Sequence, residues 1–198
     1  MNIAILTFQG FNEIDSLVAF RMLKWLDKSD WNIKICCPEI EVISMGGLVI
    51  RAQGMLEDAN KADAVIVGSG VMTRDIIKNE SIMNRINLNP SCQIIGAQCS
   101  GTLMLAKLGI LGDVPACTDS STKPWVQDAG IEVLNQPLFA KDNVATAGGC
   151  LSSAYLRAWI IAKLDRLETA KKAVHYFAPM GEKDEFVENA VNNIAPYL

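Results

Sequence analysis

Short apolar runs that alternate with helical segments constrain the fold of this chain more than any other feature. The runs at 2–8, 31–37, 64–67 and 93–95 have the length and composition of buried strands. Apolar residues recur at helical spacing in the intervening segments 14–26, 73–86 and 102–108. This alternation predicts an α/β fold, a three-layer sandwich with a mostly parallel sheet and helices on both faces.

Several further elements complete the expected architecture. Segments 41–44 and 48–51 flank two glycines and predict a small hairpin, and 138–141 with 143–147 predict a second hairpin or two short strands. Further helices are expected over four later segments, 122–129, 151–164, 168–176 and 185–194. Because no composition break interrupts the 198 residues, we expect a single domain over 1–198.

Composition excludes several classes of function. Half of the residues are hydrophobic and a fifth are charged, so the chain can bury a full core without disulfides or metals. The net charge of -4 and the absence of a Lys/Arg stripe argue against nucleic acid as a partner. No apolar run reaches about 18 residues, and the start lacks a basic leader, so we expect a cytoplasmic protein without a membrane partner.

Loops rich in small residues follow the predicted strands and should meet at one edge of the sheet. They are 68–70, 96–101 and 147–149, joined by 10–15 after the first strand. In open parallel sheets the ligand crevice lies beyond the carboxyl ends of the strands. The sequence therefore predicts that a site would form from these four loops.

Cys99 is the strongest candidate nucleophile. It lies in the segment Gly96–Gly101, between an apolar strand and a helical pattern, which is the layout of a nucleophile elbow. At the N-terminus of a helix the dipole favours a thiolate over a thiol, so we expect the pKa of Cys99 to be lowered.

The group that assists Cys99 is expected to be a carboxylate. The only histidine, His175, lies in a late helical segment and is interpreted as a surface or packing residue. Glu13 and Asp15 follow the first strand, and on a helix start only one of them can point inward. A carboxyl group whose pKa is raised by burial could pass protons to and from a thiolate. The loop at Ser69 could offer backbone N–H groups to an anionic intermediate.

The other five cysteines are interpreted as buried packing residues. They are Cys36, Cys37, Cys92, Cys117 and Cys150, none in a C-x-x-C spacing. Cys150 is the least secure of them, because it also follows glycines at a helix start near the crevice. With one histidine in the chain, no metal site is expected.

Four segments in order resemble the ThiJ/PfpI superfamily, within the class I glutamine amidotransferase-like, flavodoxin-like fold. They are Phe8–Asp15, similar to F-x-G-F followed by two residues and then an apolar residue and Asp; Val67–Arg74, similar to P-G-G-x-G-T-R; the elbow Gly96–Gly101; and the T-A-G-G signature at Thr146–Gly149. The version of the first motif that carries Asp15 most resembles isocyanide hydratases and the amidotransferase-like domain of AraC-type regulators. The resemblance covers nearly the whole chain.

The resemblance implies roles for individual residues. Cys99 would be the nucleophile and Asp15 the acid/base, while the backbone of Gly70 and Ser100 would hold developing negative charge. Further pocket candidates are Gly10, Ser69, Thr118, Asp119, Gly148 and Gly149. Two departures matter: Ser100 stands where many relatives have histidine, and Asp119 stands where hydratases often carry the histidine of T-T-H-W.

The sequence therefore predicts a cysteine-dependent hydratase or hydrolase of a small molecule. The first hypothesis is conversion of an isocyanide to an N-formamide by Cys99 and Asp15, without cofactor or metal. The alternatives are a redox- or ligand-sensing protein without turnover and a glyoxalase- or deglycase-like hydrolase. The lack of histidine after Cys99 disfavours peptidase activity. By resemblance we also expect a homodimer.

Overall fold

A computed structural model describes residues 1–198 and has a seven-stranded sheet at its centre. The strand order is β5-β2-β1-β6-β7-β9-β8. All neighbouring pairs are parallel except β8 and β9. The strands are β1 (Asn2–Leu6), β2 (Asn32–Cys37), β5 (Gly54–Met55), β6 (Ala64–Val67), β7 (Ile94–Gln98), β8 (Leu138–Lys141) and β9 (Val144–Ala147).

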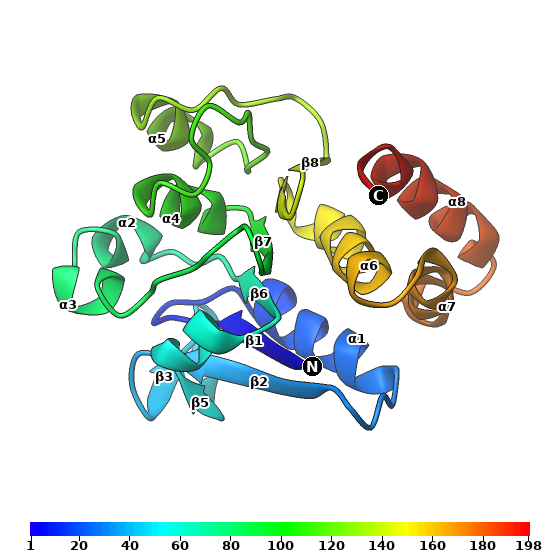
Figure 1. The fold of residues 1–198 in the computed structure, drawn as a ribbon, viewed down its shortest axis with the longest axis horizontal. Coiled ribbons are helices and arrows are strands. Elements are labelled where there is room, and N and C mark those ends of the chain that lie inside the picture. Colours follow the sequence, from blue (N-terminus) through cyan, green and yellow to red (C-terminus); the bar gives the residue numbers. More distant parts are fainter.

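Helices cover both faces of this sheet, as Figure 1 shows. One face carries α1 (Ala19–Trp25), α6 (Ser153–Leu164), α7 (Leu167–Phe177) and α8 (Lys183–Ile194), with the short turns η1 (Ile14–Val18), η3 (Cys150–Ser152) and η4 (Ala195–Tyr197) on the connections. The other face carries η2 (Leu56–Lys61), α2 (Thr73–Ile76), α3 (Glu80–Met83), α4 (Gly101–Lys107) and α5 (Lys123–Asp128). The predicted three-layer α/β sandwich is therefore confirmed.

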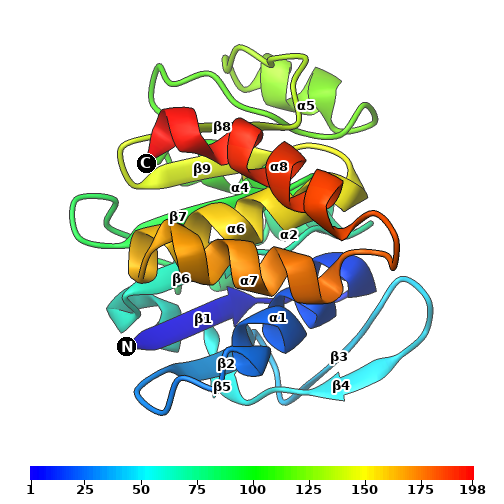
Figure 2. The same cartoon turned by 90° about the vertical axis from the view of Figure 1, so that its right-hand side faces the viewer.

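Alternation along β1 explains why the sheet is buried on both sides. Ile3 and Ile5 join the core under α1, α6 and α7, while Ala4 and Leu6 join the core under α4. Successive side chains of a strand point to opposite faces, so a run that is apolar throughout suits a sheet covered twice. Figure 2 shows α6, α7 and α8 stacked over the strands on the first of these faces.

Both predicted hairpins form. β3 (Glu41–Ile43) pairs antiparallel with β4 (Val49–Arg51), and β8 pairs antiparallel with β9. No helix of the protein is both long enough and apolar enough to cross a membrane.

Two predicted helices differ from the structure. The helix expected over 73–86 is divided into α2 and α3, because the Asn79 side chain accepts a hydrogen bond from the Ser81 N–H and starts a new helix there. The helix after β1 begins with the wide π-helical turn η1, which contains Asp15, before α1 continues it. The short strand β5 was not predicted, because two residues carry no periodic signal.

Backbone contacts bring the predicted loops together at the carboxyl edge of the sheet. Val71 N–H donates to the Gly10 carbonyl at 2.9 Å, and Asn12 N–H donates to the Ser69 carbonyl at 2.8 Å. Cys99 N–H donates to the Ala147 carbonyl at 2.8 Å. The loops after β1, β6, β7 and β9 therefore form one continuous rim.

Candidate active site

Cys99 lies on a strained turn between β7 and α4. Its φ angle is 47°, in the left-handed region that residues other than glycine rarely occupy. Gly101 lets this turn pass close to β6, because a Cβ there would lie 2.6 Å from the Val67 carbonyl oxygen. The nucleophile elbow expected from the sequence is present.

Asp15 is the carboxylate that points inward. Its side chain in η1 is 1% exposed, and its Oδ2 accepts a hydrogen bond from the Ser69 hydroxyl. Glu13 instead turns toward the β3–β4 hairpin, where its Oε1 accepts hydrogen bonds from the Ser44 hydroxyl and the Gly46 N–H. The two acids thus have different roles, and only Asp15 faces the elbow.

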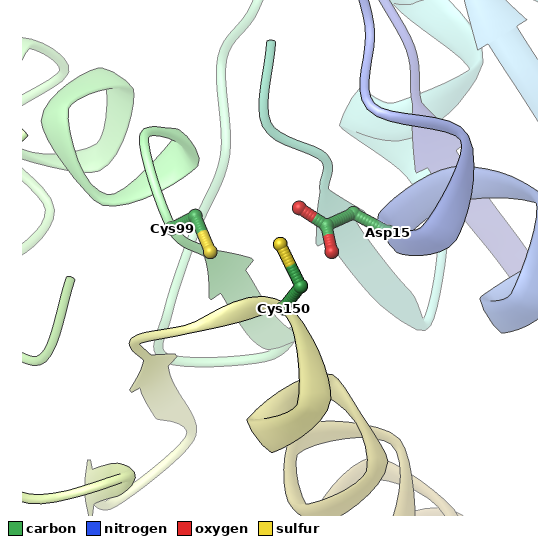
Figure 3. A group of neighbouring side chains, drawn as sticks. All are labelled: Asp15, Cys99 and Cys150. Atoms are coloured by element: carbon green, nitrogen blue, oxygen red, sulfur yellow. The ribbon is translucent and has the colours of Figure 1, made fainter. Parts of the chain in front are cut away.

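Cys150 joins these two residues. The Asp15 carboxylate oxygen and the sulfurs of Cys99 and Cys150 all lie within 4.8 Å of one another. Figure 3 shows the Cys150 sulfur pointing into the space between the other two groups. No hydrogen bond joins Cys99 to Asp15; Cys99 Sγ accepts one from Gln98 Nε2 at 3.3 Å, and Cys150 Sγ accepts one from Asn12 Nδ2 at 3.4 Å.

The packing role expected for the remaining cysteines is therefore wrong for Cys150. It is half-buried and lies at the site because η3 begins directly after Gly149, whose φ of 84° turns the chain toward the elbow. In the sequence, the T-A-G-G signature and the helix start after it were the features that could have placed Cys150 at the site. The packing role is also wrong for Cys92, which is exposed.

The electrostatics of Cys99 differ from the expectation. Burial, followed by the nearby Asp15 charge, raises the pKa of the Cys99 thiol to about 12. Burial also raises the pKa of Asp15 to about 6, opposed by the Ser69 hydrogen bond and the Arg157 charge. Desolvation outweighs the short helix α4, so at neutral pH the resting pair is an Asp15 carboxylate and a Cys99 thiol.

The two backbone groups expected to hold negative charge are not equally free. Gly70 N–H already donates to the Ser100 hydroxyl at 3.0 Å, and that hydroxyl also lies 2.8 Å from Thr73 Oγ1. The Ser100 N–H has no acceptor in the protein. The Ser100 N–H is therefore the donor that could meet an anionic intermediate in this arrangement.

A cleft of about 310 Å³ opens over the elbow. Five residues singled out in the sequence line it, namely Ser69, Gly70, Cys99, Ser100 and Asp119. Met45 and Trp125 line it as well, although no motif marked them. Met45 comes from the β3–β4 hairpin and Trp125 from α5, so only tertiary packing brings them to the cleft.

The other pocket candidates shape the loops without lining the cleft. Thr118 Oγ1 donates to the Cys99 carbonyl at 2.8 Å, and the Gly149 carbonyl accepts from Gln98 Nε2 at 2.9 Å. A Cβ at Gly148 would collide with the Thr118 carbonyl oxygen, and Gly10, with φ 74°, packs against Met72. Thr118, Gly148 and Gly149 therefore hold the backbone next to the elbow, whereas Gly10 contacts the loop after β6.

His175 lies away from this site. It is exposed on α7, and its carbonyl accepts a hydrogen bond from Lys183 Nζ. Asp15, Cys99 and Cys150 form the one cluster of three groups that could ligate a metal ion. Two thiolates and a carboxylate are ligand types that zinc accepts. The sequence predicted no metal site, because the chain has a single histidine and no pair of cysteines in a C-x-x-C spacing.

Fold and site together define an α/β protein whose strained elbow cysteine faces a buried carboxyl group. A model of the DJ-1/PfpI family matches residues 1–163, and the chain belongs to this family. The ThiJ/PfpI resemblance stated above is thereby confirmed. No curated protein matches the chain.

Solved structures share the fold at low sequence identity. A THiJ/PfpI family protein from Pseudomonas syringae superposes with a TM-score of 0.78 at 17% identity, over 98% of this chain and 87% of that one. Schizosaccharomyces pombe DJ-1 gives 0.76 at 14% identity, over 90% and 100% of the two chains. Oxidised Toxoplasma gondii DJ-1 gives 0.75 at 14% identity, over 88% and 96%.

Proposed function

We propose that the chain is a cysteine-dependent hydratase that converts a small isocyanide to the corresponding N-formamide. The observation that carries the proposal is the pairing of a strained elbow cysteine with a buried carboxyl group whose pKa is raised to about 6. The one histidine of the chain lies outside the site, so the chemistry rests on a thiol and a carboxyl.

The first half of the reaction uses Asp15 as base and then as acid. The Asp15 carboxylate takes the Cys99 proton, and the thiolate attacks the terminal carbon of the isocyanide. Asp15 returns that proton to the same carbon, which leaves a thioimidate on Cys99. Because the two groups lie within 4.8 Å without a hydrogen bond, they must close when substrate enters, as catalytic hydrogen bonds commonly do.

The second half adds water. Asp15 takes a proton from a water that attacks the thioimidate carbon, and delivers it to nitrogen. The C–S bond then breaks, the hydroxyl proton returns to sulfur, and the N-formamide leaves. The unoccupied Ser100 N–H supports this proposal, because it can donate to charge that develops beside the elbow.

Turnover of an aryl isocyanide, followed by absorbance, tests the proposal. We expect Cys99→Ala to abolish turnover and Asp15→Asn to reduce it by about 100-fold or more, the usual range for losing a general acid–base. Cys92→Ala is the matched control, because Cys92 is exposed and distant from the site, and it should keep full activity. Equal inactivity of the wild type and Cys99→Ala across a broad panel would contradict the enzymatic role.

A second candidate function, oxidation sensing, is favoured by the position of Cys150. A hydroperoxide would convert the Cys99 thiol to a sulfenic acid, releasing water or an alcohol. The neighbouring Cys150 thiol could then attack that sulfur, form a disulfide and release water. The oxidised state of the Toxoplasma gondii DJ-1 structure is in keeping with redox chemistry in a structural neighbour.

Intact mass after mild peroxide treatment separates these outcomes. The sensing role predicts loss of two hydrogens in the wild type and stable added oxygen in Cys150→Ser. Unmodified protein under conditions that oxidise a free thiol peptide would contradict it.

A further inference from the structure

A second cavity lies on the far side of Cys150 from the cleft. It has a volume of about 300 Å³ and lies between η1, the start of α6 and the helices α7 and α8. Ten of its thirteen lining residues are hydrophobic, among them Val18, Val174, Phe177 and Phe186. Its size and apolar lining are those of a site for a small ligand.

Arg157 is the one charged residue that lines this cavity, and its side chain is deeply buried. It is 6% exposed, and neither its Nε nor its Nη1 makes a hydrogen bond. No carboxylate lies within ion-pair distance of its guanidinium. A buried charge without hydrogen-bond partners is costly, and native proteins normally pair such a group.

Asp15 does not fill this role. Its charge opposes the lowering of the Arg157 pKa, but burial still lowers that pKa to about 10, which leaves the guanidinium charged at neutral pH. Asp15 Oδ2 is occupied by Ser69, and its Oδ1 has no hydrogen-bond partner. Nε and Nη1 of Arg157 are therefore left for an acceptor other than Asp15, such as an anion that enters the cavity and displaces the side chains that enclose these two atoms.

The walls of the cavity include residues beyond the family match. The DJ-1/PfpI model ends at residue 163, whereas Val174, Phe177 and Phe186 belong to α7 and α8. At the rim, Ile14 is 42% exposed and Leu151 is 84% exposed, so the approach is apolar as well. The C-terminal helices thus close a pocket against α6 that has apolar walls and one positively charged residue, Arg157.

We propose that this cavity binds a monocarboxylate with a medium-length aliphatic chain. The carboxylate would accept bidentate hydrogen bonds from Arg157, and the chain would lie along Phe177 and Phe186 toward the rim. A slender aliphatic acid can reach a guanidinium that is 6% exposed, whereas the side chains of a flat protein surface cannot. The site is separate from the proposed hydratase chemistry and does not depend on it.

Calorimetric titration with octanoate tests the proposal, with 1-octanol and octylamine as probes of the same chain length. We expect one octanoate site per chain, and binding at least tenfold weaker for the alcohol and the amine. Arg157→Met keeps the length of the side chain without its charge, and should weaken octanoate binding at least tenfold. Arg157→Lys should restore part of the affinity.

Two further variants keep the result interpretable. Val18→Trp should block octanoate by filling the cavity while leaving Arg157 in place. Cys99→Ala should bind octanoate as the wild type does, because its change lies in the other cleft. Thermal unfolding of each variant establishes that it is folded before titration.

Several results would overturn the proposal. They are no octanoate binding by the wild type, equal binding of octanoate and 1-octanol, undiminished binding by folded Arg157→Met, or loss of binding in Cys99→Ala. The first would leave the apolar rim to another occupant such as a second copy of the chain. The last would place octanoate in the cleft over the elbow.

Discussion

At the scale of single residues, burial and neighbouring polar groups act in opposite directions on the pKa values at this site. Burial raises the pKa values of both Asp15 and Cys99, while Ser69 and Arg157 act against that rise at Asp15. At neutral pH the pair holds one negative charge, on Asp15, and one proton, on Cys99, and each group affects the titration of the other. Holding the charge of Asp15 in a buried site costs stability.

This cost gives a pH dependence of folding. The pKa of Asp15 is about 6 when folded and 3.8 in its ordinary state, so the folded protein holds the proton more tightly. Stability from this group is full below pH 3.8 and is lost as the pH rises through 6, by about 3 kcal/mol. We expect Asp15→Asn to remove this loss, as measured by urea unfolding at pH 4 and pH 7.

Asp119→Asn is the matched control for that measurement. Burial acts to raise the pKa of Asp119, but hydrogen bonds from Thr122 and Ser121 outweigh it and lower that pKa, so the contribution of Asp119 is present at neutral pH and is lost only as the pH falls below 3.8. Between pH 4 and pH 7, Asp119→Asn should therefore leave the pH slope of stability near that of the wild type, whereas Asp15→Asn should flatten it. Parallel slopes for the wild type and Asp15→Asn would show that the Asp15 pKa is not raised.

Among the elements, β7 and its turn into α4 set the geometry of the site. The turn needs a left-handed Cys99 and close contact between α4 and the end of β6. β9 lies beside β7 in parallel register, with Gln98 opposite Ala147, so the following residues of both strands reach the same edge. This pairing explains why Cys150 lies near Cys99.

Two glycines flanking the elbow should respond differently to an added methyl group. At Gly101 a Cβ meets the backbone oxygens of Val67 and Gly68 at 2.6 and 2.9 Å, which cannot move without shifting β6. At Gly96 it meets the flexible side-chain ends of Ile160 and Leu156 at 2.8 and 3.0 Å. We expect Gly101→Ala to cost about 2 kcal/mol or more and Gly96→Ala about 1 kcal/mol or less.

Urea unfolding measures both costs, and alkylation of Cys99 reports the geometry of the elbow. Gly101→Ala should change the alkylation rate, whereas Gly96→Ala should leave it near that of the wild type. A smaller loss of stability for Gly101→Ala than for Gly96→Ala would contradict the contacts described at the turn.

Across the protein, α6 connects the sheet to the C-terminal helices. Trp159 on α6 is fully buried, and its indole N–H donates to the Tyr197 carbonyl at 3.1 Å. Its neighbours in the same core come from β1, β6, α7 and α8. This packing predicts that the sheet and the last two helices unfold together.

Trp159→Ala tests that cooperativity. We expect a loss of about 3–5 kcal/mol, the usual cost of removing a buried large aromatic side chain, with a single unfolding transition retained. Trp125→Ala, on half-buried α5, should cost less, because that ring contacts Arg74 at the surface of the cleft. Two separate transitions, of which Trp159→Ala shifts one, would show that α7 and α8 fold apart from the sheet.

Local patterns sufficed for the layer order, the elbow and every strand of the central sheet except β5. Apolar runs without polar interruption can be buried only in a sheet covered on both faces, and small residues between strand and helix allow a tight turn at Cys99. The same reasoning left Glu13 and Asp15 as alternatives, and only the family resemblance favoured Asp15. The choice depended on the hairpin that holds Glu13, which lies about 30 residues away in the chain.

Long-range packing decided everything that depends on distance or burial. It placed Cys150 between Asp15 and Cys99, raised the pKa of Cys99 against the influence of its helix, and occupied the Gly70 N–H with Ser100. It also buried Arg157 without a partner under α7 and α8. Residue type and spacing specify which groups can react, whereas desolvation and proximity arise only when distant segments pack, and those two quantities set the chemistry.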